Sequence, residues 1–142
     1  MDAFDADVLI YAAAPDHPLG RRIAPLFSPS PEHPDSPVGV GSTLLLPEVL
    51  AKPMRDGLRQ EAQVLARLLA RLNLHRFDRA TAEIATALAM RYRLRAADAA
   101  HLATAVAIGA DRFLTNNQRD FPTSIREIDV VYPAALPAPR TD

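Results

Sequence analysis

Short apolar runs alternate along the chain with longer stretches in which apolar residues recur every three or four positions. Leu58–Leu72 has the recurrence of an amphipathic helix, whereas Arg112–Thr115 is too short for a helix and is typical of a buried strand. The same patterns predict strands at Met1–Asp5, Val38–Leu46, Leu74–Phe77 and Ser124–Val131, and helices at Leu19–Phe27, at Thr81–Tyr92 and from Ala96 to a stop at Gly109. A further helix is expected to begin at Pro47, because proline suits the first helical position. This alternation predicts an α/β fold, a three-layer α/β/α sandwich with a mainly parallel sheet of four or five strands.

Two proline-rich segments interrupt this alternation. Residues 28–37 (SPSPEHPDSP) contain no large apolar residue, so we expect them to form an exposed loop within the domain. The tail Pro133–Asp142 is expected to fray. The pattern leaves Asp7–Ala14 open, because its apolar residues would also suit a buried strand that continues from Phe4. The 142 residues are expected to form a single domain.

The composition excludes several chemistries. The chain has no cysteine, so disulfides, thiolate catalysis and Cys-ligated zinc are ruled out. No apolar run reaches the roughly 18 residues of a membrane span, and no secretion signal is apparent, so we expect no membrane association and a cytoplasmic location. The net charge of −1 does not indicate a nucleic-acid binder. All sixteen basic residues except Lys52 are arginines, which suit phosphate recognition, although the codon bias of a GC-rich genome would give the same excess.

Four acidic residues are predicted to lie at the edge where a parallel sheet binds ligands. Asp5 and Asp120 follow predicted strands, and Glu48 and Asp98 fall in the first turns of predicted helices. Carboxylates gathered in one cleft repel each other, so they either retain protons or bind a cation. Oxygen ligands without cysteine favour Mg²⁺ or Mn²⁺. Such an ion would activate a water and neutralise charge on a phosphate, which is what phosphodiester hydrolysis needs.

Three segments resemble one protein family. They are FDADVLIYA at 4–12, LLLPEVLAK at 44–52 and DAAHLATAVAIGADRFLTNNQRDF at 98–121. In this order and at this spacing they resemble PIN domains, most closely the VapC-type toxin ribonucleases. The resemblance implies a metal-dependent endoribonuclease with an acidic cluster, in which Asp5, Glu48 and Asp98 match acidic residues of the family. It also favours a strand that ends at Asp5 and a helical turn near Asp7, which would be the N-cap and which occupies a position often held by Asn or Ser.

The fourth acidic position departs from the commonest family pattern. Many PIN domains have Thr-x-Asp after the fourth strand, whereas here Thr115 is followed by Asn116 and Asn117. A subset of VapC-like members has Thr-x-Asn-x-x-Asp-Phe, which Thr115, Asn117 and Asp120 satisfy. By this resemblance Asp120 is the fourth carboxylate and Asn117 an orienting or neutral ligand, while Thr115 either hydrogen-bonds a carboxylate or only ends the strand. The metal ligands so implied are Asp5, Asp98 and Asp120.

Three further residues near these motifs allow more than one interpretation. His101 lies one helical turn after Asp98, and we interpret it as a hydrogen-bonded core residue rather than a metal ligand. Lys52 and Arg55 follow Glu48 by one and two helical turns, so they either contact RNA phosphates or remain solvated.

The resemblance also implies partners. They are an RNA substrate, an antitoxin that inserts a segment into the acidic cleft, and a second copy of the chain in a homodimer. The alanine-rich helix predicted at Thr81–Tyr92 would allow close helix packing in such a dimer.

Other functions stay open at this point. FDADV also resembles the Asp-x-Asp motif of HAD-type phosphotransferases, with Asp5 as nucleophile and Asp7 as acid, although Lys52 is the only lysine such an enzyme could use. A PIN scaffold with a weakened fourth ligand could instead be a non-catalytic binding or regulatory module. A PIN nuclease could also act on DNA, or in RNA processing rather than as a toxin.

Overall fold

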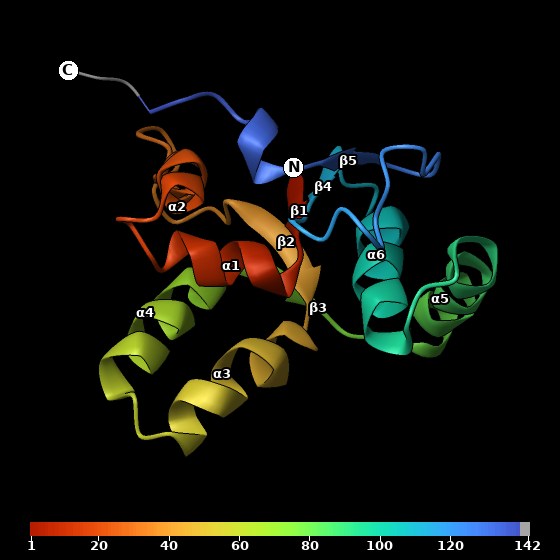
Figure 1. Cartoon of the computed structure of the whole chain (residues 1–142), viewed down its shortest axis with the longest axis horizontal. Helices are drawn as coiled ribbons and strands as arrows, with labels where there is room; N and C mark the ends of the chain where they lie inside the picture. The colour runs from red at the N-terminus through yellow and green to blue at the C-terminus, as the bar shows by residue number, and fades with distance from the viewer. Residues whose placement is uncertain (140–142) are drawn as a thin grey trace.

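A sheet of parallel strands lies at the centre of the molecule (Figure 1). The computed structural model describes residues 1–139. Within them the strands are β1 (Asp2–Phe4), β2 (Gly39–Ser42), β3 (Leu72–His75), β4 (Arg112–Leu114) and β5 (Asp129–Val131). They form one five-stranded sheet in the order β3-β2-β1-β4-β5, and every neighbouring pair is parallel. The predicted α/β fold with a parallel sheet is therefore confirmed.

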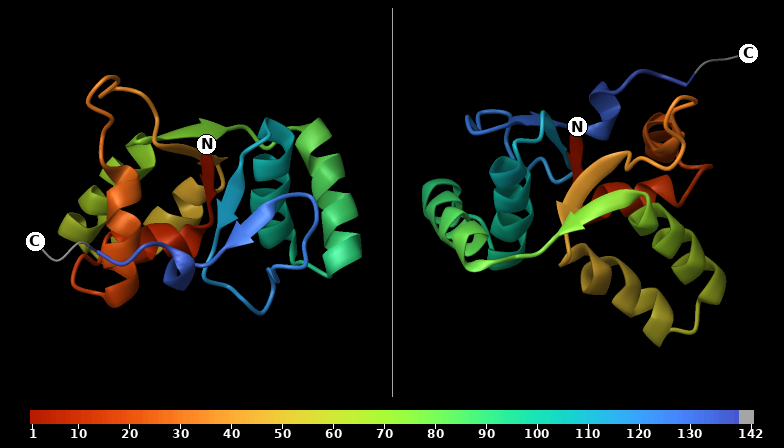
Figure 2. Two further views of the ribbon diagram at one scale, coloured as in Figure 1. Left: turned by 90° about the horizontal axis from the view of Figure 1, so that it is seen from above. Right: turned by 180° about the vertical axis from the view of Figure 1, so that it is seen from behind.

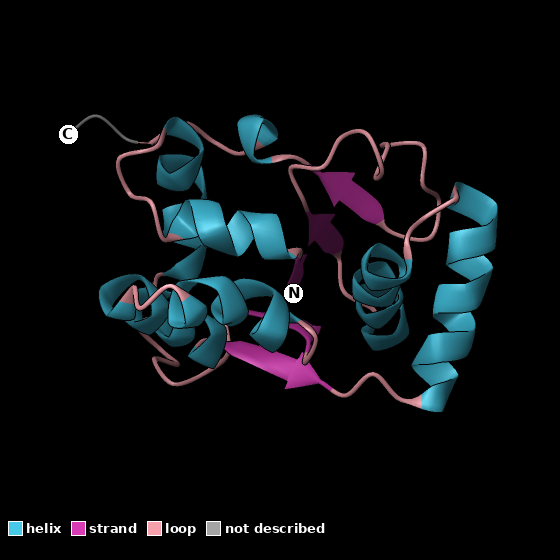
Figure 3. Ribbon diagram, turned by 60° about the horizontal axis from the view of Figure 1, so that its bottom comes forward, coloured by secondary structure: helices cyan, strands magenta, loops and turns pink. Residues whose placement is uncertain are grey.

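Helices cover both faces of this sheet (Figures 1 and 3). They are α1 (Ala6–Ala12), α2 (Pro18–Ile23), α3 (Leu45–Arg55), α4 (Arg59–Ala70), α5 (Arg79–Tyr92) and α6 (Ala96–Ile108), with short 3-10 helices at Ala24–Phe27 and Pro133–Ala135. Side chains alternate between the faces of a strand. Accordingly, Phe4 and Leu114 pack in one core with α1 to α4, and Ala3 and Phe113 pack in a second core with α5 and α6.

The order in which strands are added to the sheet reverses between β1 and β4, although all strands run parallel. It passes from β1 to β2 and β3 on one side, and then returns to β4 and β5 on the other. Phe4 pairs with Leu114, and the backbone N–H of Asp5 donates to the Leu114 carbonyl at 2.9 Å. Asp5 and Thr115 therefore lie next to each other at the carboxyl ends of two central strands. Doubly wound sheets bind their ligands at such a switch point.

The boundary between β2 and α3 differs from the prediction. The expected strand ran to Leu46, but β2 ends at Ser42 and α3 already begins at Leu45. The Ser42 hydroxyl accepts the N–H of Leu44 at 3.1 Å, and this local bond turns the chain out of the sheet. Pro47 is thus the third residue of the helix rather than the first, and Glu48 still lies in the first turn.

Other boundaries shift for similarly local reasons. The strand predicted at Leu74–Phe77 was placed two residues too late, since β3 is Leu72–His75. The strand predicted at Ser124–Val131 was made too long at its start, since β5 is Asp129–Val131. The helix predicted at Leu19–Phe27 is divided into α2 and a 3-10 turn that contains Pro25.

The C-terminal tail is packed against the domain as far as Leu136. Pro133–Ala135 forms a 3-10 helix, and Leu136 is buried against the core of α1 to α4. The guanidinium of Arg22 on α2 donates to the carbonyl of Leu136 at 2.5 Å. The prediction of a frayed tail is therefore wrong for these residues, and its last part, residues 140–142, lies outside the described residues.

Residues 28–37 are all exposed and form a loop that extends from the body of the molecule, between α2 and β2 (Figure 2). Within residues 1–139, no helix has both the length and the apolar character needed to cross a membrane.

We predict that Gly20→Ala destabilises the pairing of α1 with α2. A Cβ at residue 20 would clash with the carbonyl oxygens of Tyr11 and Ala14, which belong to the backbone and cannot rotate away. The free energy of unfolding, measured in urea, should fall by about 1–3 kcal/mol. The neighbouring exposed change Arg21→Ala serves as control and should shift it by less than about 0.5 kcal/mol. Equal effects of the two changes would show that this close approach is not a constraint.

Candidate active site

Asp5 is held at the centre of the candidate site, directly after β1. Its side chain accepts the N–H of Ala6 at 2.8 Å, as the N-cap of α1, and the hydroxyl of Thr115 at 2.7 Å. Asp5 is only 6% exposed. Burial raises the pKa of the Asp5 carboxyl, although the bond from Thr115 and the nearby His101 oppose this rise. A buried carboxylate in this place is stabilised either by a proton or by a cation.

The loop after β4 forms a hydrogen-bonded chain from Asp5 to Asp120. The buried hydroxyl of Thr115 donates to Asp5 and accepts the N–H of Asn117 at 3.1 Å. The side-chain amide of Asn117 donates to the Asp120 carboxylate at 2.9 Å, and its oxygen accepts the N–H of Asp120 at 3.2 Å. Asn117 therefore orients Asp120, and Thr115 hydrogen-bonds a carboxylate rather than only ending the strand.

Glu48 and His101 meet across the edge of the sheet. Glu48 lies in the first turn of α3, and its carboxylate accepts a hydrogen bond from Nε2 of His101 on α6. The side chain of His101 is 1% exposed, whereas that of Glu48 is 38% exposed. One ligand atom from each of Asp5, Glu48 and His101 lies within 4.8 Å of the others. His101 is thus buried and hydrogen-bonded, as we expected of a core histidine, but its partner is a predicted site residue.

Asp98 completes this group from the first turn of α6. Its pKa is raised by burial and then by the negative charges of Asp5, Asp120 and Glu48, while His101 opposes the rise. The charges of the four predicted acidic residues therefore act on one another at this edge of the sheet. Among residues 1–139, the group whose ligand atoms all lie within 4.8 Å of one another is Asp5, Glu48 and His101, and it does not include Asp98 or Asp120.

Asp7 belongs to the same group, which the sequence analysis missed. It was predicted to cap α1, but Asp5 is the cap. One oxygen of Asp7 accepts the N–H of Asn116 at 3.0 Å, and the other is buried without a hydrogen-bond partner. Burial, with a smaller contribution from the charge of Asp5, raises the pKa of Asp7 to about 7. The signal that could have indicated this was an aspartate at a position often held by Asn or Ser.

The two predicted RNA-binding residues lie in different surroundings. Lys52 lines a groove of about 290 Å³ between α1, α3 and α4, beside Glu48. Arg55 lies farther along α3, where it forms an exposed pair with Asp56 at 3.7 Å. Only Lys52 is therefore adjacent to the acidic group.

The donors at this edge fit a hard divalent cation. They are mainly carboxylate oxygens, which Mg²⁺ and Mn²⁺ prefer. The raised pKa values of Asp5 and Asp98 show that their negative charges are poorly compensated by the protein alone. A buried oxygen of Asp7 also lacks a donor. A cation at this edge would compensate the charges of Asp5 and Asp98 and would give the buried Asp7 oxygen a partner. His101 adds one nitrogen to the possible ligands.

These pKa shifts predict a stability that depends on both pH and metal. A carboxyl whose pKa is raised above its usual value of about 4 holds its proton better in the folded chain, so stability falls as pH rises toward the raised value. This holds for Asp5, Asp7 and Asp98, and the raised pKa of His101 acts in the same direction above about pH 6.5. We expect the metal-free protein to melt at a lower temperature at about pH 8 than at about pH 5.5.

Millimolar Mg²⁺ or Mn²⁺ should raise the melting temperature more at the higher pH, because these cations bind ionised carboxylates. Asp98→Asn should flatten the pH dependence, and Glu32→Gln, an exposed change in the loop of residues 28–37, should not. The same metal response at both pH values would contradict an ion site made of these carboxylates.

Comparisons with known proteins identify the family and the fold. The sequence model of the PIN domain matches residues 3–123. No curated protein sequence matches the chain significantly. Among solved structures, one described as a toxin-antitoxin complex from Klebsiella pneumoniae is similar with a TM-score of 0.67 and 24% identity, covering 94% of this chain and 98% of that one. The crystal structure of VapBC2 from Rickettsia felis, bound to a DNA fragment from their promoter, has a TM-score of 0.68 and 15% identity, covering 92% and 97%. The family match spans most of the chain and includes the strands and helices that carry Asp5, Glu48 and Asp98, so this protein belongs to the PIN domain family.

Proposed function

We propose that this protein is a metal-dependent endoribonuclease, the toxin of a toxin–antitoxin pair. The observation that carries the proposal is the group of Asp5, Glu48, Asp98 and Asp120 at the switch point of the sheet, where the pKa values of Asp5 and Asp98 are raised. Such a group is suited to binding a divalent cation and, through it, a phosphate.

The residues have distinct roles in this proposal. Asp5, Asp98 and Asp120 hold Mg²⁺ or Mn²⁺, which when bound supplies an acidified water and charge compensation at the scissile phosphate. Thr115 fixes the orientation of Asp5, and Asn117 fixes that of Asp120. These positioning bonds fix the acidic side chains before the substrate binds, so little reorganisation is needed.

Glu48 and Lys52 extend the site toward solvent. Both line the groove between α1, α3 and α4, and Glu48 is the more exposed member of its bond with His101. Glu48 therefore lies at the mouth of the site. Lys52 is placed to bind an RNA phosphate one turn away, and a lysine at this distance compensates the charge of the bound strand.

The proposed antitoxin partner rests on two supports. One similar structure is described as a toxin-antitoxin complex, and the other is VapBC2 bound to a DNA fragment from their promoter. The acidic edge is also suited to a guanidinium, which forms strong paired hydrogen bonds with carboxylates. A short reading frame upstream of the gene, encoding a DNA-binding protein that co-purifies with this chain and suppresses its activity, would support the toxin role.

A non-catalytic PIN scaffold is the second candidate function. The observation that favours it is the neutral Asn117 where many PIN domains have an aspartate. A HAD-type phosphotransferase is not supported, because the chain belongs to the PIN family. In addition, Asp5 is 6% exposed and both of its carboxylate oxygens accept hydrogen bonds. A nucleophile for phosphoryl transfer needs an accessible oxygen.

The direct test is cleavage of end-labelled RNA by the purified protein. Cleavage with Mg²⁺ or Mn²⁺ that EDTA abolishes supports the proposal, and cleavage of DNA alone would make the protein a deoxyribonuclease. Absence of cleavage together with absence of metal binding by calorimetry would favour the scaffold.

We predict that Asp120→Asn reduces RNA cleavage to the level of the metal-free reaction. The change removes a charge from the metal group but keeps the side chain's size, so the fold should remain intact. Asn117→Ala should lower the rate by about 10–100-fold, because Asp120 then loses its orienting bonds. Gln118→Ala, at an exposed residue of the same loop, is the matched control and should leave the rate unchanged. Full activity of Asp120→Asn would remove Asp120 from the site.

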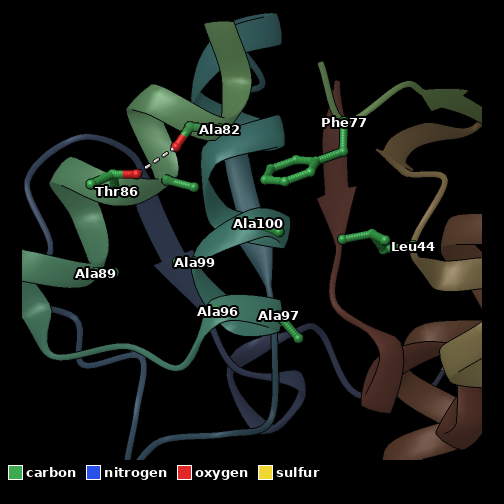
Figure 4. A pocket seen from close by; sticks show the side chains of 10 residues that line it. Leu44, Phe77, Ala82, Thr86, Ala89, Ala96, Ala97, Ala99 and Ala100 are labelled. Carbon is green, nitrogen blue, oxygen red and sulfur yellow. Dashed lines mark hydrogen bonds between the residues drawn. The ribbon is translucent and has the colours of Figure 1, made fainter. Parts of the chain in front are cut away.

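A second prediction concerns the proposed homodimer. An apolar groove of about 620 Å³ runs between α5, the start of α6 and the residues Leu44 and Phe77 (Figure 4). Its walls are mostly alanine, and Phe77 is 37% exposed. Met90, which is 79% exposed, lies one turn from Thr86 on α5. Small and exposed apolar residues along one helix allow a second copy to pack closely.

We therefore expect Thr86→Arg to convert a dimer into a monomer, because a long charged side chain would fill the groove and resist burial. Met54→Arg places the same charged side chain at an exposed residue on α3, outside the groove, and should leave the mass unchanged. Light scattering at micromolar concentration measures both. A monomeric wild type, or a dimer that Thr86→Arg does not affect, would rule out this surface.

A further inference from the structure

A side-chain hydrogen bond joins α3 to α6 at the candidate site. Glu48 lies on α3 and His101 on α6, and these helices pack in different cores on opposite faces of the sheet. Among residues 1–139, the bond from Nε2 of His101 to the Glu48 carboxylate is the only side-chain hydrogen bond between α3 and α6. The orientation of Glu48 toward the other carboxylates therefore depends on His101.

The side chains of His101 and Glu48 differ in how freely they can change rotamer. The ring of His101 is 1% exposed, and its neighbours Leu102 and Ala105 on α6 are in the core, so the ring has no space to rotate. The side chain of Glu48 is 38% exposed and would otherwise sample several rotamers. His101 is thus the fixed member of the pair, and Glu48 is the member whose position is set.

Packing alone does not explain a histidine at this place. Nδ1 of His101 is buried without a hydrogen-bond partner, which is a cost that an apolar side chain would avoid. The nitrogen that faces the acidic group is Nε2, and it already donates to Glu48. Because Nε2 is already used by this bond, His101 is better suited to holding Glu48 in place than to binding a metal directly.

We infer that His101 is a positioning residue that holds the carboxylate of Glu48 over the candidate site, an inference that rests on the proposed metal-dependent nuclease function. The ring carries out no step of the reaction. It removes the rotamer freedom of Glu48 in advance, so that this carboxylate is already placed when metal and RNA bind.

The test compares three replacements of His101. His101→Leu removes the donor. His101→Gln keeps an N–H donor about as far from the backbone as Nε2 of His101. His101→Asn also has an N–H donor, but its shorter side chain cannot reach Glu48. Thr104→Val is the matched control, since Thr104 is buried one turn later on α6 and its hydroxyl donates only to the carbonyl of Ala100 at 2.8 Å. The measurements are stability in urea, Mn²⁺ affinity by calorimetry, and kcat and KM for RNA.

His101→Leu should lower kcat by about 10–100-fold and leave KM within about twofold, and its stability should equal or exceed that of the wild type. His101→Gln should restore most of kcat, while Thr104→Val should change neither constant. In a Glu48→Ala background, His101→Leu should cause no further loss of kcat or of Mn²⁺ affinity, because His101 acts through Glu48.

Three results would overturn the inference. The first is a further loss in the Glu48→Ala background, which would make His101 an independent ligand. The second is equal activity of the Gln and Asn variants, which also decides the matter if His101→Leu does not fold. The third result concerns stability, and it is needed if the wild type neither cleaves RNA nor binds Mn²⁺, which would mean that the proposed function itself fails. In that case the free energy of unfolding of the single and double variants shows whether His101 and Glu48 interact. If the effects of the two replacements simply add, the two side chains are not coupled and the inference fails.

Discussion

The pairing of β1 with β4 is the constraint on which the rest of the structure depends. It places Asp5 beside Thr115, although 110 residues separate them, and the bond from the Thr115 hydroxyl closes the switch point of the sheet. The loop that follows Thr115 then carries Asn117 and Asp120 back over this edge. Slippage of β4 by one residue would turn Phe113 and Leu114 to the wrong cores, so the packing of both faces fixes the register. Core packing and site geometry are therefore set by the same strand pair.

Burial at this edge has an electrostatic cost that the remainder of the protein offsets. Asp5 is buried with Asp7, Asp98 and Glu48 nearby, and the hydrogen bonds from Thr115 and Ala6 compensate only part of its charge. Stability must come from elsewhere, mainly from the two apolar cores on either side of the sheet. A buried acidic group of this kind is typical of a metal centre, and here the fold itself places the side chains.

The fold could be predicted from the sequence because the alternation of short apolar runs with helical periods is a strong pattern. Its boundaries could not, since a run such as Leu44–Leu46 suits the end of a strand as well as the start of a helix, and only the Ser42 turn decides between them. Ile125 and Ile128 are buried outside any strand, which shows that apolar character predicts burial better than it predicts strand.

For the site, the ordered motifs indicated Asp5, Glu48, Asp98 and Asp120, because each lies next to a predicted strand or helix boundary. The contributions of Asp7 and His101 were missed for a physical reason. Their partners, Asn116 and Glu48, lie 109 and 53 residues away, and nothing local to either residue signals such contacts.

The distance of 110 residues between Asp5 and Thr115 also has a consequence for synthesis. The ribosome releases β1 first, yet β1 has no β4 to pair with until residues 112–114 have emerged. Until then Asp5 lacks Thr115, and Asp120 does not yet exist. A nascent chain, or one truncated before β4, therefore carries an incomplete acidic group. For a protein proposed to cleave RNA, this order of appearance means that the messenger and the ribosome making it are not exposed to a complete site until the segment that carries β4 and Asp120 has been translated.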